Sequence, residues 1–413
     1  MDYDIAVIGA GASGLVAAIS AVREGATVCL IDRNERVGRK ILATGNGRCN
    51  LANNDMNRKH FHSSAPGFVE SVLENVALGG VLSFFASLGL EVASEDSRLY
   101  PRSMQAASVL DVLRHEVDRL RIAILTNVRV LSVSRSGGLF RLGLQGQETM
   151  VVGQVILATG GKAAPKLGTS GDGYALAAAL GHDIVEPIPA LVGLRLLSPH
   201  LKGLAGLRIQ ASVGIPELGT QQSGEVLFAD YGVSGIPVFD LSAAAAAALR
   251  NNRPMHLIIS IMPDTPEELH ERLEQRFALL RHKTALDVLI GLLPKQLGPA
   301  LLKDAGFSAL NKSASHVTEQ ELASLAVLLH AWSFAILDHN GWVQAQTTAG
   351  GVDLKQVFPA DMQSKICPGL YFSGEILDVH GDCGGYNLMW AWSSGILAGR
   401  SAATRGYILD VRR

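Results

Sequence analysis

Cysteine is scarce in this sequence. Its 413 residues include four cysteines, Cys29, Cys49, Cys367 and Cys383, and no two of them form a C-x-x-C pair. So sparse a set in a long chain excludes a disulfide framework and offers no zinc-binding spacing. The sequence therefore predicts reduced thiols, as is typical of a cytoplasmic protein.

Long apolar runs and an excess of one charge are also missing. No apolar run reaches the ~18 residues that suggest a transmembrane helix, and the N-terminus carries Asp2 and Asp4 in place of a basic leader. Lys plus Arg is 36 and Asp plus Glu is 38, a net charge of −2, which gives no general attraction to nucleic acid or anionic membrane. We expect a soluble cytoplasmic protein with a small-molecule substrate and neither nucleic-acid nor membrane partners. The oligomeric state is not indicated.

Histidine is present without any metal-binding pattern. The 12 histidines include no H-E-x-x-H motif and no paired arrangement, so we predict no metal site. In contrast, the chain is rich in apolar residues (48%) and in glycine (44 residues), which indicates a large core and many tight turns or close backbone approaches.

The first 32 residues have the pattern of a dinucleotide-binding βαβ unit. An apolar run, YDIAVI, precedes Gly9, Gly11 and Gly14 in a G-x-G-x-x-G motif, and a helical segment and a second apolar run follow. The glycines permit a tight turn, close approach of a pyrophosphate and close helix–strand packing. Asp32, at the end of the second run, is placed to bind the adenosine ribose.

Features far along the chain favour FAD over a nicotinamide dinucleotide. A nicotinamide cofactor would need only the first βαβ unit, whereas a flavin also has a ring to hold at its far end. Thr159 and Gly160 end a buried strand, Gly374 and Glu375 end another, and Asn387 with Leu388 opens a helix. Binding segments that return from the C-terminal region suit the longer cofactor.

The pattern changes at Pro187 and Pro189 and returns to a glycine-rich type near Thr347, where the segment TTAGGV is expected to be a loop. We therefore predict an α/β fold: a Rossmann-like, two-dinucleotide-binding FAD domain at 1–189 and 346–413, with an insertion. The insertion comprises a β-barrel-like subdomain at 190–263 and 337–345 and a small helical subdomain at 264–336.

Several helices are predicted by their caps and periodicity. Residues 66–90 and 104–120 are expected to be helical, and the six alanines after Ser242 to form a packed helix. Capping boxes begin at Thr265 and Thr318. One helical face is predicted behind the second box, formed by Leu322, Leu325, Leu329, Trp332 and Ile336.

A set of motifs distributed from end to end resembles the YhiN/BaiN-type flavoproteins, which are NAD(P)/FAD-dependent oxidoreductases with aminoacetone oxidase-like relatives. The motifs are GAGASG, GRKILATGNGRCN, ATGGKAAPKLGTSGDGYALAAALGH, GEVLFADYGVSGIPV, TTAGGVDL and PGLYFSGEILDVHGDCGGYNLMWAWSSG. GNGRCN together with GGYNL is specific to that group. The resemblance implies FAD and the same inserted-barrel architecture.

The resemblance also implies roles for individual residues. Gly9, Ala12, Ser13 and Gly14 would lie against the pyrophosphate, and Asp32 and Arg33 would frame the adenosine ribose. Arg39 and Lys40 would hold phosphate or adenosine, and Val128 would bind adenine through its backbone. Glu375 would contact the ribityl chain or pyrophosphate, and Asn387 and Leu388 the pyrimidine end of the ring. One further segment would pass along the ribityl chain and the edge of the flavin. It comprises Thr44, Gly45, Asn46, Gly47, Arg48, Cys49 and Asn50.

The catalytic acid or base is not indicated. His380 and Tyr386 are weak candidates for proton donation, with structural roles at least as well supported. Cys49 has no neighbour at the spacing of a dithiol relay, so we expect a small residue packed near the flavin, although a pairing with Cys383 stays open.

The best-supported function is hydride transfer through flavin N5 between NAD(P)H and a small organic acceptor, such as a conjugated double bond. A second G-x-G-x-x-G unit is missing, so NAD(P)H would bind only transiently. Two alternatives remain: an FAD-dependent oxidase of a small amine that uses O2, and a flavin-containing RNA-modifying or redox-sensing protein.

Overall fold

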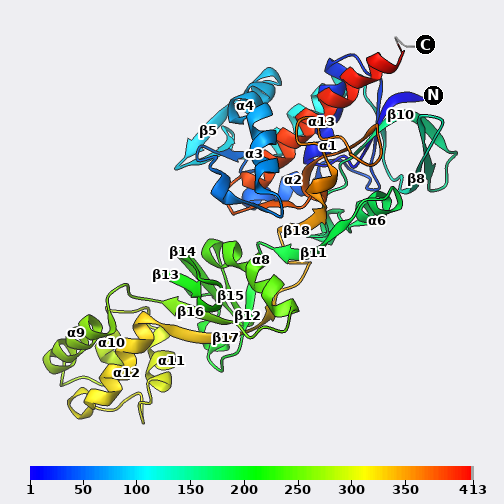
Figure 1. Ribbon diagram of the computed structural model, residues 1–413. Helices are drawn as coiled ribbons and strands as arrows, with labels where there is room; N and C mark the ends of the chain where they lie inside the picture. Colours follow the sequence, from blue (N-terminus) through cyan, green and yellow to red (C-terminus); the bar gives the residue numbers. More distant parts are fainter. Residues whose placement is uncertain (411–413) are drawn as a thin grey trace. The chain divides into compact units, whose positions relative to one another are not determined.

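The structure is a computed structural model that describes residues 1–410, with the backbone alone for residues 405–410. The chain forms two compact units (Figure 1). One is Met1–Pro189 together with the segment from Ala345 onward, and the other is Ala190–Gln344. Each unit contains its own cluster of buried apolar side chains.

The first unit is built on a seven-stranded sheet in the order β7–β2–β1–β10–β9–β8, in which β19 also pairs with β10. Its parallel part comprises β7 (Ala123–Leu125), β2 (Val28–Ile31), β1 (Tyr3–Ile8), β10 (Met150–Leu157) and β19 (Leu370–Phe372). The hairpin of β8 (Val130–Ser136) and β9 (Leu139–Leu144) extends the sheet beside the first half of β10. Parallel strands bring their carboxyl ends to one edge, where open sheets of this kind bind ligands.

Two helices pack closely beside this sheet. The helix α1 (Ala12–Arg23) runs next to the long C-terminal helix α13 (Tyr386–Asp410) (Figure 1, blue and red). A Cβ on Gly395 would lie 2.5 Å from the Ser13 carbonyl oxygen, and one on Gly399 only 2.2 Å from that of Ala17. The missing side chains therefore allow the two backbones to approach, with both helices starting at the same end.

The remaining elements of the first unit surround the sheet or form short ribbons. The pairs are β3 and β5 each with β6, β4 with β20, and β11 with β18. Their bounds, with those of the other helices, are α2 (Arg39–Ala43), β3 (Ala52–Asn53), β4 (Phe61–Ser63), α3 (Pro66–Asn75), α4 (Leu78–Ser87), β5 (Val92–Glu95), β6 (Arg98–Pro101), α5 (Ala106–Arg119), α6 (Asp172–Ala179), β11 (Ile184–Ala190), β18 (Thr347–Val352) and β20 (Val379–Gly381).

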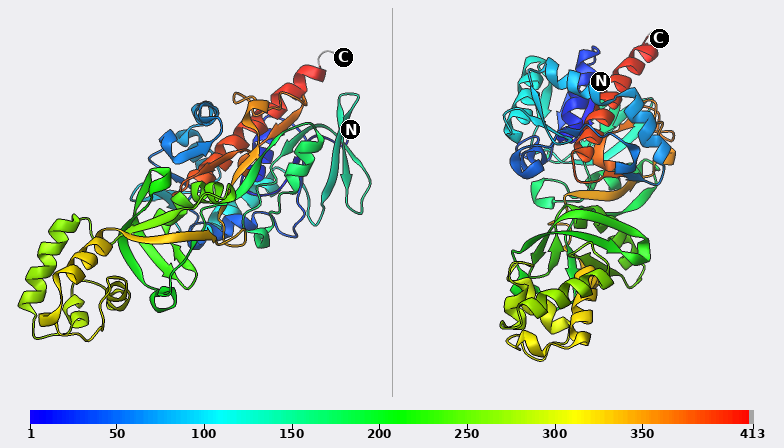
Figure 2. Two further views of the ribbon diagram at one scale, coloured as in Figure 1. Left: turned by 60° about the horizontal axis from the view of Figure 1, so that its bottom comes forward. Right: turned by 90° about the vertical axis from the view of Figure 1, so that its left-hand side faces the viewer.

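The second unit contains a closed six-stranded barrel (Figure 2). Around the barrel the order is β12 (Leu194–Leu196), β15 (Gly232–Ser234), β14 (Thr220–Ala229), β13 (Arg208–Ile215), β16 (His256–Ser260) and β17 (Trp332–His339). A short helix, α7 (Leu201–Leu204), and the alanine-rich α8 (Ile236–Arg250) pack against its strands. The packed alanine helix expected from the sequence is therefore confirmed.

A group of helices lies between β16 and β17 in the chain: α9 (Pro266–Leu279), α10 (Ala285–Leu289), α11 (Leu297–Asp304) and α12 (Glu319–His330). Both capping boxes are present, with Thr265 bonded reciprocally to Glu268 and Thr318 to Glu321. The predicted fold class, a Rossmann-like FAD-type domain with an inserted barrel and a small helical part, is confirmed.

The prediction that residues 66–90 are helical is confirmed by two helices, α3 and α4, which meet at an angle of 44°. Two other local predictions were wrong. The TTAGGV segment, expected as a loop, is strand β18. Trp332 and Ile336 do not continue the face of α12, because the helix ends at His330 and both residues lie in β17. Residues four apart share a face in a strand as well as in a helix, so their spacing did not discriminate.

No helix among residues 1–410 is by itself long and apolar enough to cross a bilayer, although α3 and α4 taken together meet that test by length and composition.

Candidate active site

An open cleft lies at the carboxyl ends of the parallel strands. Gly9 follows β1, Asp32 follows β2 and Thr159 lies just beyond β10, while the first turns of α1 and α13 also reach the cleft. It brings together many of the residues predicted from the sequence: Gly9, Gly11, Ala12, Ser13, Asp32, Arg39, Lys40, Thr44, Thr159, Gly160, Glu375, Asn387 and Leu388.

The three glycines of the first motif have different surroundings. Gly9 has φ +106° and a Cβ there would lie 2.4 Å from the Ala158 carbonyl oxygen. A Cβ on Gly14 would lie 1.8 Å from the Gly9 carbonyl oxygen, so Gly14 permits the close passage of α1 over the turn. Gly11 is the opposite case, because a Cβ there would meet no atom within 4 Å. Gly11 therefore borders open space in the cleft.

The N-terminus of α1 has no side-chain cap and no acidic residue in its first turn. Its first N–H groups have no carbonyl partner within the helix, and the helix dipole adds partial positive charge. Such an end suits a phosphate group.

Asp32 is a structural partner of the glycine turn. One carboxylate oxygen accepts a hydrogen bond from Ala10 N at 2.7 Å, and the other accepts two from Asn34, from its backbone N and its Nδ2. The side chain is buried and also lines the cleft. Because a carboxylate can accept about four hydrogen bonds, Asp32 retains capacity for a ribose hydroxyl.

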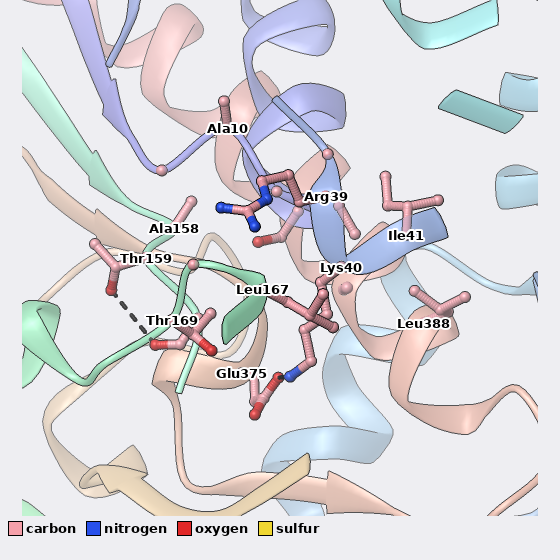
Figure 3. Close-up of a pocket in the computed structure, with 18 of the residues that line it drawn as sticks. Ala10, Arg39, Lys40, Ile41, Ala158, Thr159, Leu167, Thr169, Glu375 and Leu388 are labelled. Atoms are coloured by element: carbon pink, nitrogen blue, oxygen red, sulfur yellow. Dashed lines mark hydrogen bonds and ion pairs between the residues drawn. The ribbon is translucent and has the colours of Figure 1, made fainter. Parts of the chain in front are cut away.

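Two basic side chains reach into the cleft from α2 (Figure 3). Lys40 Nζ pairs with Glu375 Oε2 at 2.7 Å, and the other oxygen of Glu375 accepts a hydrogen bond from Thr348 N. Arg39 donates to the Lys166 carbonyl at 2.9 Å and to Asn34. Arg39 therefore brings positive charge to the cleft beside the helix N-terminus, which suits a pyrophosphate, while the charge of Lys40 is balanced by that of Glu375.

A second cavity borders the first through Gly9, Asp32 and Thr159. Arg33 and Arg129 both pair with Asp172, the first residue of α6. Burial acts to raise the pKa of Asp172, but hydrogen bonds from Ser170 and Arg33 and the nearby arginine charges hold it below its ordinary value. Val128 also lines this cavity, although its N–H already donates to the Asp32 carbonyl at 3.0 Å. Its carbonyl alone remains for adenine.

The start of α13 forms the opposite end of the cleft. The Asn387 side chain accepts from Gly381 N and donates to Gly381 O, both at 2.8 Å, and Thr347 donates to it at 3.3 Å. The Asn387 amide thus holds the preceding loop, and Asn387 and Leu388 both line the cleft.

The remaining predicted residues lie outside the lining of both cavities. Gly374 bonds through its N–H to Ser394, and Arg48 pairs with Glu95 and stacks over Tyr100. The residues concerned are Gly14, Gly45, Asn46, Gly47, Arg48, Cys49, Asn50, Gly374, His380 and Tyr386.

The loop from Gly45 to Asn50 is a turn with unusual backbone. Gly45, Asn46, Gly47 and Cys49 all have positive φ, which is costly for the two residues that are not glycine. Cys49 is fully buried, and burial raises the pKa of its thiol to about 11, against a smaller opposite effect of a hydrogen bond with Thr44. None of the four cysteines forms a disulfide in the described part of the chain.

The sequence did not indicate several residues that line these cavities. Asp172 follows a glycine in GTSGDG, and its place at the start of α6 was the available signal. Gln346 precedes the TTAGGV segment, which was expected to be a loop, and Thr347 is the first residue of that segment. The others are Ile8, Ala10, Ile31, Asn34, Arg36, Gly38, Ile41, Arg129, Val130, Ala158, Leu167, Gly168, Thr169, Ser170, Leu176, Val379, Trp390 and Ala391. Within residues 1–410, no group of His, Cys, Asp or Glu side chains is arranged to hold a metal ion.

The residues present fit FAD. Gly11 leaves room where a side chain would project, the first turns of two helices line one cleft, and Arg39 supplies positive charge. The second cavity, with its aliphatic and arginine lining, is suited to a purine.

Residues 3–401 match the family model described as "HI0933-like protein Rossmann domain". The chain is 40% identical over 407 residues to the 3-dehydro-bile acid delta(4,6)-reductase of Clostridium scindens, covering 97% of this chain and 99% of that protein. It is 30% identical over 400 residues to the ribosomal RNA dihydrouridine synthase of Escherichia coli, covering 95% and 96%.

Among solved structures, the chain resembles the 3-ketosteroid delta1-dehydrogenase of Sterolibacterium denitrificans, with a TM-score of 0.51 and 13% identity over 98% of this chain and 99% of that one. At this identity the likeness concerns the fold alone.

Proposed function

The chain belongs to the HI0933-like family of FAD-dependent oxidoreductases, and on this basis we propose that it reduces a conjugated carbon–carbon double bond in a small molecule. The observation that carries the proposal is the 40% identity, over nearly the full length of both chains, to a delta(4,6)-reductase. The name of the more distant relative, a dihydrouridine synthase, likewise describes the saturation of a double bond in a ring.

The geometry of the cleft supports this chemistry, because its residues are suited to hold the FAD that the reaction needs. FAD, when bound, supplies hydride transfer through its N5 atom. The N-terminus of α1 with Arg39 and Lys40 would hold the pyrophosphate, and Asp32 the adenosine ribose. The first turn of α13 would direct N–H groups toward the pyrimidine edge of the ring, where negative charge builds on reduction.

The electron donor we propose is NADH or NADPH. The chain has one G-x-G-x-x-G unit, and we assign it to FAD. The nicotinamide would therefore bind transiently, deliver its hydride and leave before the acceptor enters.

Anaerobic titration of the purified, FAD-loaded enzyme tests the proposal. We expect the flavin absorbance to bleach with NADH or NADPH and to return when a steroid with a conjugated 4-en-3-one is added. Rapid bleaching by a small amine and recovery with O2 would instead support the oxidase alternative. Recovery with an unmodified ribosomal RNA fragment, but not with small enones, would support the RNA-modifying one.

A further inference from the structure

Most polar side chains that line the cleft already have hydrogen-bond partners within the protein. At the end formed by α13, Thr347 donates to Asn387 at 3.3 Å, and the Asn387 amide also bonds Gly381 in both directions. Lys40 and Glu375 form an ion pair with each other. These groups are occupied before any substrate enters.

Two side chains of the lining are different. Arg36 and Gln346 make no side-chain hydrogen bond or ion pair with any residue in the described part of the chain, and both are exposed. Arg36 belongs to the loop after Asp32, on the side that we assign to the adenosine. Gln346 directly precedes Thr347, whose hydroxyl bonds Asn387 at the flavin end.

Gln346 therefore offers a complete amide at the flavin end of the cleft. A glutamine side chain has two N–H donors and one carbonyl acceptor, and within residues 1–410 none of them is used. No other polar side chain at that end of the described lining has all of its hydrogen-bonding capacity left for a ligand.

The exposure of Gln346 favours a substrate over the cofactor as its partner. Val379 is buried, and Asn387 and Leu388 are half-buried, whereas Gln346 is exposed. An exposed residue of the lining lies on the solvent side of the cleft, from which a substrate approaches once FAD is in place. Its amide is therefore available to the molecule that enters second.

We propose that Gln346 binds the carbonyl oxygen of the substrate, and that its side-chain amide donates a hydrogen bond to that oxygen while the double bond is reduced. The inference rests on the proposed function, the reduction of a conjugated carbon–carbon double bond. It narrows the substrate class to compounds in which this double bond is conjugated to a carbonyl group.

The need for a donor follows from the movement of electrons. Addition of hydride to the β-carbon of an enone forms a C–H bond and shifts the π electrons toward the carbonyl, which gives an enolate with negative charge on its oxygen. The enolate then takes a proton from water at its α-carbon, which releases hydroxide and restores the carbonyl. An N–H donor stabilises the charged oxygen more than the neutral one, because charge-assisted hydrogen bonds are stronger.

A phenolate tests this contact without turnover, since its negative oxygen on an unsaturated ring resembles that of the enolate. The oxidised, FAD-loaded full chain is titrated with 4-cyanophenol, at a pH where the phenol is ionised, and the change in flavin absorbance gives the dissociation constant. Gln346→Met removes the donor at similar length and should weaken phenolate binding about tenfold, at the lower end for a hydrogen bond to a charged group. Its binding of benzonitrile, which lacks the oxygen, should be unchanged. Gln346→Lys restores a donor and should restore phenolate binding.

The matched control is Gln147→Met, since Gln147 is an exposed glutamine of the first unit outside the lining of both cavities. It should bind the phenolate as the unsubstituted protein does. Equal phenolate affinity in the Gln346→Met and unsubstituted proteins would overturn the contact. Loss of FAD affinity in Gln346→Met would also overturn it, because the amide would then hold the cofactor.

Anaerobic reoxidation of the reduced enzyme separates this inference from the proposed function. In Gln346→Met we expect reoxidation by an enone to slow at least about tenfold, while bleaching by NADH or NADPH keeps its rate. If no enone reoxidises the unsubstituted enzyme, the proposed function is wrong and the role of Gln346 falls with it. If enones reoxidise both proteins at the same rate, only the role of Gln346 is wrong.

Discussion

At the scale of single residues, the empty space beside Gly11 makes a sharp prediction. A Cβ there would meet no protein atom within 4 Å, and the side chain of a valine would occupy the path we assign to the pyrophosphate. Gly11→Val should therefore fold with a melting temperature close to that of the unsubstituted apoprotein, yet retain no FAD after gel filtration. Gly67→Val, at an exposed position of α3 that is also uncrowded, should stay yellow. A Gly11→Val protein that keeps its flavin would refute our placement of the pyrophosphate.

His380 should impose a pH dependence on stability. Its Nδ1 is buried without a hydrogen-bond partner, and burial lowers its pKa to about 3 from 6.5. Between these values the unfolded chain binds a proton that the folded chain does not, so stability falls as pH falls, by up to roughly 1.4 kcal/mol per pH unit. Urea denaturation of His380→Gln between pH 7 and pH 4 should show a shallower loss than the unsubstituted protein. Equal slopes would show that His380 is not the group responsible.

Cys49 should be unreactive in the folded protein. Its thiol is fully buried and its pKa is raised to about 11, so almost no thiolate is present near neutral pH. Alkylation with iodoacetamide followed by peptide mapping should modify the less buried Cys383 first and Cys49 only after denaturation. Cys49→Ser enzyme should still take up two electrons per FAD. Loss of reducing equivalents beyond those of the flavin would show that Cys49 participates in a disulfide.

At the scale of elements, the contact of α1 with α13 should be the packing contact of the first unit that is most sensitive to added side-chain atoms. A side chain on Gly399 would collide with the backbone of α1 at Ala17, and overpacking of this kind typically costs about 1–3 kcal/mol. Gly399→Val should lower the free energy of unfolding by that amount and also weaken FAD binding, because the two helix N-termini would separate. Arg400→Ala, the exposed neighbour on α13, should change neither quantity appreciably.

Elements with purely local signals could be predicted from the sequence. The caps at Thr265 and Thr318 are local hydrogen-bond patterns, and both boxes form as expected. The end of α12 could not be located, because Trp332 and Ile336 satisfy a helical and a strand period alike. The strand β18 could not be recognised either, since its glycines resemble a loop and its partner β11 lies far away in sequence.

The same distinction applies to the site. The glycine turn and Asp32 are neighbours in one βαβ unit, so their spacing alone indicated a dinucleotide. The Lys40–Glu375 pair joins residues 335 positions apart. Neither residue type nor spacing reveals such a pairing, because it depends on which strands become neighbours in the folded sheet.

At the scale of the whole molecule, all residues that line the two cavities belong to the first unit. They lie between Ile8 and Leu176 and between Gln346 and Ala391, so the insertion from Ala190 to Gln344 supplies none of them. Its buried side chains form a separate apolar cluster. The two units therefore differ in role: we assign cofactor binding to the first and expect the second to contribute only to the reaction with substrate.

Replacing residues 191–344 with a short Gly-Ser linker tests this division. The shortened protein should fold, because β11 and β18 pair with each other at the base of the insertion and the core of the first unit is left complete. It should bind FAD with nearly unchanged affinity, measured by quenching of flavin fluorescence, while its turnover of an enone falls sharply. Far-UV circular dichroism and the melting temperature establish that the variant is folded. A folded variant without FAD affinity would show that the insertion helps to hold the cofactor, whereas full enone turnover would show that the first unit alone binds the substrate.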